Sequence, residues 1–200
     1  MTKAKYSASM VKIPFWFLEF KKMMQLLYSG KNLTEIRDLN RQENIFSASS
    51  DMRATQVFNN MSTRVKALDP KFVELFQQSD ISNQKLIALI AVMESNSLFF
   101  DFMYEVFREK LIIGINEITD NDINAFFRNK QTQDERVAQW TDQTIGRLRT
   151  SFKTYLNEAG VLENTMGRQR ILRPLLDQSL EQMLKQCGMG VTLNILTGVR

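Results

Sequence analysis

The sequence predicts a mainly α-helical protein built from several helices. We expect a helix-turn-helix-like lobe at the N-terminus, buried helices in the centre, and a winged-helix-like lobe with a small β-hairpin at the C-terminus. Apolar residues recur at helical spacing along almost the whole chain, which is the main indication. Glycine (8) and proline (3) are too few among 200 residues for a loop-rich protein. Residues 98–113, LFFDFMYEVFREKLII, are apolar around most of a helix, which is typical of a central buried helix.

Residues that start or stop helices set the element boundaries. The first helix is expected between Pro14 and Gly30, and the third ends before Pro70. Thr119 is expected to be an N-cap, because acidic residues follow it in the first turn. The expected helices are about 15–28, a second that opens at Thr34, then 50–68, 71–78, 83–97, 98–113, 120–130 and 141–159. We divide the chain into an N-terminal lobe (1–80), a central helical region (81–139) and a C-terminal lobe with its tail (140–200).

The residue inventory excludes several classes of function. The chain has no histidine and one cysteine, so it lacks the side chains of Ser–His–Asp and Cys–His nucleophilic sites and of ordinary zinc sites. It contains neither of the glycine-rich phosphate-binding motifs, GxGxxG and GxxxxGK[ST]. We therefore expect no enzyme activity, no cofactor, no metal and no small-molecule substrate. The longest apolar run, Leu86–Met93, is too short for a membrane span, and no signal peptide is evident, so we expect a cytoplasmic protein without membrane contact.

Charge is distributed unevenly along the chain. Residues 1–66 hold 11 Lys and Arg against 5 Asp and Glu, residues 67–146 hold 7 against 13, and residues 147–200 hold 8 against 4. The net charges are therefore +6, −6 and +4, while the whole chain carries +4. Two cationic regions separated by an acidic one favour attraction to a polyanion through particular faces of the molecule.

The stronger candidate for nucleic-acid binding is the helix expected at 141–159. Its apolar face consists of Ile145, Leu148, Phe152, Tyr155, Leu156 and Ala159. Its opposite, polar face consists of Gln143, Arg147, Thr150, Lys153 and Asn157, with Arg149 on the flank. Thr141 or Thr144 can cap the start of this helix, and Gly160 can end it in the left-handed conformation.

A short hairpin is expected after this helix. Val161–Leu162 and Arg170–Leu172 are expected to pair across a polar turn that Asn164 and Gly167 serve. Strand alternation places Arg168 and Arg170 on one face, whereas Arg173, next to Pro174, has no predicted place.

A cationic helix followed by a basic hairpin is typical of a winged helix-turn-helix. Arg147, Thr150 and Lys153 would then face the major groove, and Arg168, Arg170 and Arg173 would contact the phosphate backbone. The alternative is a solvated helix and a basic loop that bind nothing, because charge runs are usually exposed surface.

A second candidate lies near the N-terminus, in LTEIRDLNRQENIFSASSDMRATQVFNNMSTRVKAL. The pattern is helix, connection, helix, and helical spacing places Arg53, Gln56, Asn60 and Arg64 on the outer face of the second helix. Arg, Gln and Asn are the residues that make bidentate hydrogen bonds to guanine or adenine. The connection, residues 43–49, is longer than the usual helix-turn-helix turn, so a plain helical pair is the alternative.

Several of these segments together resemble one family. KYSASMVKIPFWFLEFKKMMQLLYSG, SSDMRATQVFNNMSTRVKALDP and WTDQTIGRLRTSFKTYLNEAGVLE with RQRILRPLL are similar to BrxA proteins of BREX, the bacteriophage exclusion systems. The resemblance spans about residues 6–176. It implies a cytoplasmic, largely helical protein without known enzymatic activity, related in fold to the NusB antitermination factor. It also implies binding to double-stranded DNA, beside a methyltransferase, an ATPase and other BREX proteins. The basic positions that match are Arg147, Arg149, Arg168, Arg170 and Arg173, and the tail 178–200 lies outside the match.

We therefore expect a non-catalytic double-stranded DNA-binding accessory protein with low sequence specificity. Other BREX proteins are expected as further partners. An RNA-binding NusB-like module is one alternative, and a protein–protein adaptor within the BREX complex is another.

Overall fold

A computed structural model describes residues 6–199 of the chain. The fold is mainly helical with one two-stranded antiparallel hairpin near the C-terminus, which confirms the predicted class. The chain forms two compact units: one is Trp16–Ser95, and the other runs from Asn96 onward and includes the residues before Trp16. The predicted boundaries after residues 80 and 139 do not coincide with this division. Within residues 6–199 no single helix is both long enough and apolar enough to cross a membrane.

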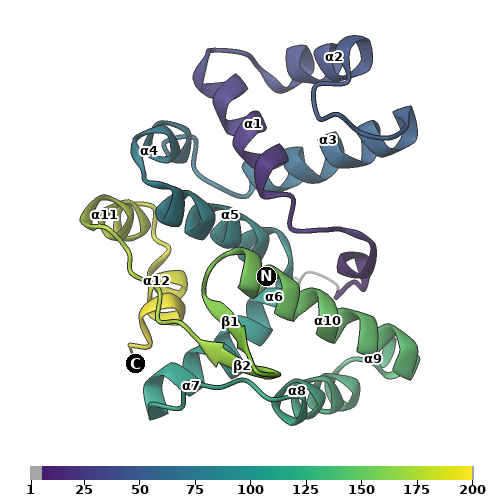
Figure 1. The fold of residues 1–200 in the computed structure, drawn as a ribbon, viewed down its shortest axis with the longest axis vertical. Helices are drawn as coiled ribbons and strands as arrows, with labels where there is room; N and C mark the ends of the chain where they lie inside the picture. The colour runs from purple at the N-terminus through teal and green to yellow at the C-terminus, as the bar shows by residue number, and fades with distance from the viewer. Residues whose placement is uncertain (1–5, 200) are drawn as a thin grey trace. The chain divides into compact units, whose positions relative to one another are not determined.

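The unit Trp16–Ser95 is all helical (Figure 1). Its helices are α1 (Phe17–Tyr28), α2 (Leu33–Glu43), α3 (Asp51–Lys66), α4 (Phe72–Gln78) and α5 (Ile81–Ser95). Phe20 and Phe76 meet edge to face in its core, with ring centroids 5.7 Å apart. A capping box between Asn32 and Glu35 starts α2 one residue before the predicted start.

The connection between α2 and α3 is held by local hydrogen bonds. Asn44 has positive φ, and its side chain both accepts from the backbone N–H of Ala48 and donates to its carbonyl. The Asn40 side chain donates to the carbonyl of Ala54, which ties α2 to α3. Ser50 then caps α3 by accepting from the N–H of Arg53.

The second unit contains the remaining elements. These are η1 (Ser9–Lys12), α6 (Ser97–Phe102), the π-helical turn η2 (Met103–Phe107), α7 (Arg108–Ile113), α8 (Asp120–Gln133), α9 (Glu135–Ala138), α10 (Asp142–Glu158), β1 (Leu162–Thr165), β2 (Arg168–Ile171), α11 (Gln178–Gln186) and α12 (Gly190–Thr197). The continuous helix predicted over 98–113 therefore contains a π-helical turn. Helices α11 and α12 were not predicted from the sequence.

Aromatic side chains form the core of this unit. Phe152 of α10 packs against Phe99 and Phe102 of α6 and against Phe127 of α8, with centroid distances of 5.1, 4.9 and 5.7 Å. The predicted apolar face of α10 is buried at every position except Ile145, which is half-buried. The helix is thus fixed between its neighbours, and its opposite face carries the polar side chains.

The hairpin is built on a two-residue turn. Leu162 pairs with Ile171 and Thr165 with Arg168, so Met166 and Gly167 form the loop. Both loop residues have positive φ, 51° and 81°, as a type I′ turn requires. Asn164 was predicted in the turn, which is wrong: it lies in β1 opposite Gln169.

A third chain segment lines the other edge of β2. Glu117 forms a β-bridge with Arg170, the N–H of Ile118 donates to the carbonyl of Gln169, and the N–H of Ile171 donates to that of Asn116. Residues 116–118 lie between α7 and α8 in the sequence. Strand β2 therefore has β1 along one edge and residues 116–118 along the other.

Candidate nucleic-acid interface

The polar face of α10 presents Arg147 and Thr150 to solvent. Thr141 caps the helix by accepting a hydrogen bond from the N–H of Thr144. Within residues 6–199 Arg147 has no hydrogen-bond or ion-pair partner, and Thr150 bonds to the Gly146 carbonyl of its own helix. Both side chains can therefore meet a ligand without losing a contact to another element.

Arg149 and Lys153 face an acid on the neighbouring helix. Lys153 Nζ lies 2.8 Å from Asp120 Oδ1, and Arg149 Nε lies 4.0 Å from Asp120 Oδ2. Arg149 also donates to the side-chain oxygen of Asn124, 2.9 Å away. The hydrogen bond from Lys153, with the charge of Arg149, holds the pKa of Asp120 below its ordinary value. Two of the predicted DNA-binding cations are thus partly neutralised within the protein.

The N-terminal segment adds a cation, Lys12, that is not among the predicted site residues. A groove of about 630 Å³ runs between η1 and α10 and is lined by Val11, Lys12, Gln143, Gly146, Arg147, Arg149, Thr150 and Ser151. Lys12 is exposed and has no ion-pair partner among residues 6–199. No local sequence pattern could have predicted that Lys12 lies near Arg147, because the two residues are far apart in the sequence.

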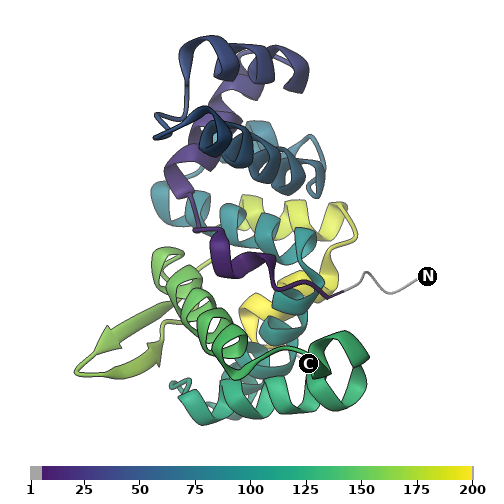
Figure 2. The same cartoon turned by 90° about the vertical axis from the view of Figure 1, so that its right-hand side faces the viewer.

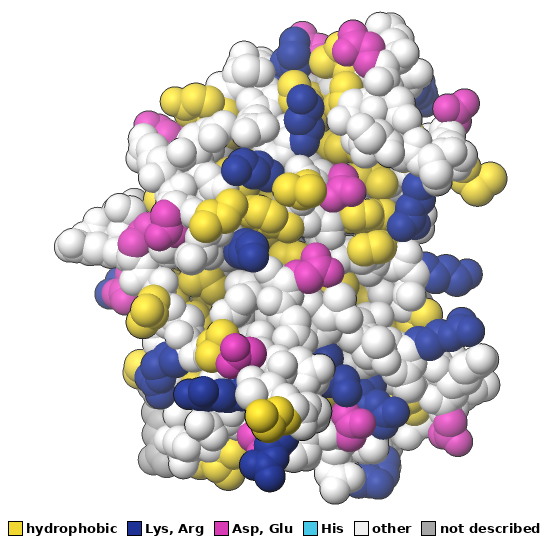
Figure 3. Space-filling view, viewed as in Figure 1, with side chains coloured by type: hydrophobic (Ala, Val, Ile, Leu, Met, Phe, Trp, Pro, Cys, Tyr) yellow, Lys and Arg dark blue, Asp and Glu magenta, His cyan; other side chains and the backbone are white. Residues whose placement is uncertain are grey.

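A second groove lies on the other side of α10, against α8. It is lined by Asn124, Phe127, Arg128, Gln131, Asp142, Ile145, Gly146 and Arg149. Arg128 is exposed and adds another cation at this edge. Lys and Arg side chains, mixed with Asp and Glu, gather over the part of the surface that α8 and α9 form (Figure 3).

An ion cluster around the buried Lys130 anchors the N-terminal segment beside α10. Lys130 of α8 is 2% exposed, and its Nζ lies 2.8 Å from Asp101 and 2.6 Å from Glu105. The Tyr6 hydroxyl donates to Asp101 and accepts from Lys130. Burial alone would lower the pKa of Lys130, but the hydrogen bonds to Asp101 and Glu105 outweigh it and raise the pKa above its ordinary value. Lys130 therefore stays charged and holds Tyr6 in place.

The hairpin carries two cations on one face, as predicted. Leu162 and Ile171 are buried against the unit, and Arg168 and Arg170 are exposed. Neither arginine has a side-chain partner within residues 6–199, although Glu163 is the cross-strand neighbour of Arg170. The hairpin projects from the unit beside α10 (Figure 2).

Arg173 has a structural role in addition to any contact it makes outside the protein. Its guanidinium donates to the carbonyl of Thr197, at 3.0 Å, and to that of Leu111, at 3.3 Å. These carbonyls belong to the last turns of α12 and α7, where unpaired backbone acceptors and the helix dipole favour a cation.

The N-terminal candidate residues are mostly engaged within the protein. The Arg53 guanidinium lies 4.6 Å from the Trp16 ring centroid and donates to the Gln56 side chain, at 2.6 Å. Asn60 donates to the Gln56 carbonyl of its own helix. The outward orientation predicted for Arg64 is wrong: Arg64 is 4% exposed. Helix α3 packs against α1, α2 and α5, so part of the face that spacing assigned to solvent is covered.

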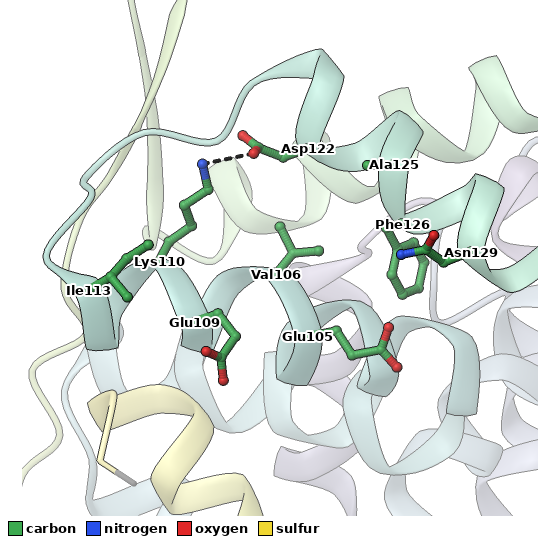
Figure 4. Close-up of a pocket in the computed structure, with 9 residues that line it drawn as sticks. All are labelled: Glu105, Val106, Glu109, Lys110, Ile113, Asp122, Ala125, Phe126 and Asn129. Atoms are coloured by element: carbon green, nitrogen blue, oxygen red, sulfur yellow. Dashed lines mark ion pairs between the residues drawn. The ribbon is translucent and has the colours of Figure 1, made fainter.

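One further pocket lies between α7 and α8 and has a different character (Figure 4). Glu105 and Glu109 point to one side of it, and the ion pair between Lys110 and Asp122, 2.8 Å long, closes another side. Within residues 6–199 no cluster of three potential metal-ligating side chains occurs. The carboxylates would repel phosphate groups, so this pocket is not part of the candidate interface.

Comparison with known proteins indicates one family. The family model BrxA matches residues 4–188. "BREX protein BrxA" of Bacillus cereus (strain H3081.97) is 37% identical over 193 residues, which is 96% of each chain. "BREX protein BrxA" of Escherichia coli O9:H4 (strain HS) is 22% identical over 157 residues, 78% of this chain and 73% of that one. The crystal structure of an uncharacterized protein from Magnetospirillum magneticum shares the fold, with a TM-score of 0.80 and 15% identity over 98% of this chain and 100% of that one.

Proposed function

The chain belongs to the BrxA family, and from this premise we propose that it is a non-catalytic, cytoplasmic double-stranded DNA-binding component of a BREX phage-defence system. Duplex DNA is the proposed ligand, and other BREX proteins are the proposed protein partners. The proposed binding has little sequence preference, because most of the available cations are suited to phosphates rather than to base edges.

The observation that carries the proposal is the order of elements around α10. Helix α7 is followed by the segment 116–118, which meets β2 through an isolated β-bridge, then by helices α8 and α10 and strands β1 and β2. Strand β2 lies between β1 and the segment 116–118, and the β1–β2 turn projects from the unit. This order resembles that of a winged helix-turn-helix, in which the second helix enters the major groove and the hairpin contacts the backbone. The insertion of α9 between α8 and α10 makes the turn longer than usual.

The charges of this unit fit such a role. Arg147 on α10 and Arg168 and Arg170 on the hairpin are exposed cations without internal ion pairs in the described part of the chain. In the proposed complex Arg147 and Thr150 face the groove, and Arg168 and Arg170 meet phosphates. Arg149 and Lys153 contribute less, because Asp120 already pairs with them.

Binding to unrelated duplexes across a salt series tests the proposal. Each phosphate contact contributes about −0.9 to the slope of log affinity against log salt. Replacing Arg147, Arg168 and Arg170 together by Ala should therefore make the slope shallower by about 1.8–2.7, because Arg168 and Arg170 contribute about 0.9 each and Arg147, which faces the groove, adds at most about 0.9 more. Mobility shift or fluorescence anisotropy measures the affinity, and thermal melting confirms that the variant is folded.

A triple variant of equal charge change serves as the control. Lys22, Lys71 and Lys185 are exposed and lie outside both candidate binding regions. Their replacement by Ala should change the slope by less than about 0.9. An unchanged slope in the arginine variant would refute the proposed interface. Stronger competition by duplex RNA would favour an RNA-binding module, and absence of any nucleic-acid binding at low salt would favour a protein adaptor.

A further inference from the structure

The tip of the hairpin carries a methionine whose side chain is fully exposed. Met166 is 100% exposed, the highest value among the large hydrophobic side chains of the described residues. It lies between Thr165 and Gly167 in a segment whose other side chains are polar or absent. Exposed apolar side chains are common singly, so exposure alone assigns no role.

The backbone of Met166 is the second observation. Its φ of 51° lies in the left-handed region, which costs a residue with a β-carbon roughly 1–2 kcal/mol and which asparagine and glycine tolerate best. A type I′ turn ordinarily carries Asn-Gly, and here it carries Met-Gly. A strained residue that exposes an apolar side chain lowers the stability of the isolated protein. Such strain is typical of positions that contact a ligand.

The cations next to Met166 indicate what kind of ligand it would contact. Arg168 and Arg170 follow it on the same projecting hairpin, and both are exposed. An apolar tip flanked by cations matches the side chains that minor-groove proteins insert between base pairs, where methionine is one of the residues used. The cations hold the phosphates while the apolar side chain replaces part of the base stacking.

We infer that Met166 is an apolar wedge that enters the minor groove of duplex DNA at a flexible pyrimidine–purine step and bends the duplex. This inference rests on the proposed function, since it requires the hairpin to meet duplex DNA. Pyrimidine–purine steps are the cheapest to unstack, whereas A-tracts are stiff. The protein would therefore bend DNA by roughly 20–90° and favour flexible steps modestly without reading base edges.

Energy transfer between dyes on the two ends of a duplex measures the bend, and anisotropy of one dye measures binding in the same sample. One duplex has a TA step at its centre, and a second of equal length has an uninterrupted A-tract. The wild-type chain should bend the TA duplex more than the A-tract duplex. Met166→Leu should keep the bend, because leucine is also used as a wedge.

Met166→Asn is the decisive variant. Asparagine fits the left-handed position and restores the preferred Asn-Gly turn, so this variant should melt no lower than wild type. It should bind the TA duplex about tenfold more weakly, because a buried methionine contact is lost, and it should not bend the duplex. Met52, which is 84% exposed on α3, provides the control, and Met52→Ala should leave the bend unchanged.

The outcomes separate the two proposals. Binding of the wild-type chain without bending, or bending by Met166→Asn equal to that of wild type, would overturn the wedge and leave the proposed function standing. No change in anisotropy with wild-type protein on either duplex would overturn both.

Discussion

Replacing Asp120 by asparagine should strengthen duplex binding. Asp120 pairs with Lys153 at 2.8 Å and lies 4.0 Å from Arg149, and both cations belong to the helix proposed to enter the groove. The change removes one negative charge from this edge and releases one or both cations for phosphates. Asparagine keeps the size of the side chain at the first position of α8, so the helix should still form.

The expected magnitude follows from counterion release. Each released cation that meets a phosphate steepens the salt slope by about 0.9, so the variant should show a slope steeper by about 0.9–1.8. Over a tenfold fall in salt concentration, affinity relative to wild type should rise roughly eightfold for one cation and about sixtyfold for two. Fluorescence anisotropy with a labelled duplex across a salt series measures both quantities.

A second ion pair, far from the candidate interface, provides a control that separates the release of cations on α10 from the change of net charge. Glu181 and Lys185 form an exposed ion pair of 3.8 Å on α11, away from the candidate interface. Glu181→Gln also removes one carboxylate and releases one lysine, and it should leave the slope nearly unchanged. If Asp120→Asn binds no better than wild type, or no better than Glu181→Gln, Lys153 and Arg149 do not meet the duplex.

The stability of the Asp120 variant should change little. The Asp120 side chain is 54% exposed, so its pair with Lys153 contributes at most about 1 kcal/mol. The pKa of Asp120 is lowered in the folded chain, so this contribution is present above the ordinary aspartate pKa. It is lost as pH falls through the lowered value. Urea unfolding at neutral and acidic pH should show the difference between wild type and variant only at neutral pH.

Three further substitutions should affect stability more than DNA affinity. Arg173→Ala should lower the free energy of unfolding by about 1–3 kcal/mol in urea, since two helix-end carbonyls lose a charged donor, while the salt slope falls by at most about 0.9. Lys130→Ala should cost about 3 kcal/mol in the same assay, because Asp101 and Glu105 are left without their cation. Arg64→Ala should lower the melting temperature, since this side chain is buried, and should weaken duplex binding less than the Arg147, Arg168 and Arg170 variant does. A stable Arg64→Ala variant with a large loss of affinity would make α3 the principal DNA-binding helix.

The sequence by itself determined most of the helices and the hairpin, because both arise from local patterns, although α9, α11 and α12 were not predicted. Pro14, Gly30, Pro70 and Thr119 mark helix ends through backbone geometry and capping, which act over a few residues. The apolar spacing in α10 indicated its buried face, since a helix repeats every 3.6 residues wherever it lies. The π-helical turn at Met103–Phe107 was not predicted, because the apolar pattern there covers most of the circumference and does not reveal one inserted residue.

Only the tertiary structure decided which cations remain available. Lys153 and Arg149 meet Asp120 from a separate helix, and the partners of Arg173 lie on two others. The exposed cation Lys12 comes close to α10 because Tyr6 is bound by Lys130 and Asp101 and because the Tyr155 hydroxyl lies 2.6 Å from the carbonyl of Ile13. Helical spacing assigns a side chain to a face of its own helix, but whether a charge on that face is buried, paired or exposed depends on what packs there. Those neighbours come from distant parts of the chain, and only the folded structure brings them together.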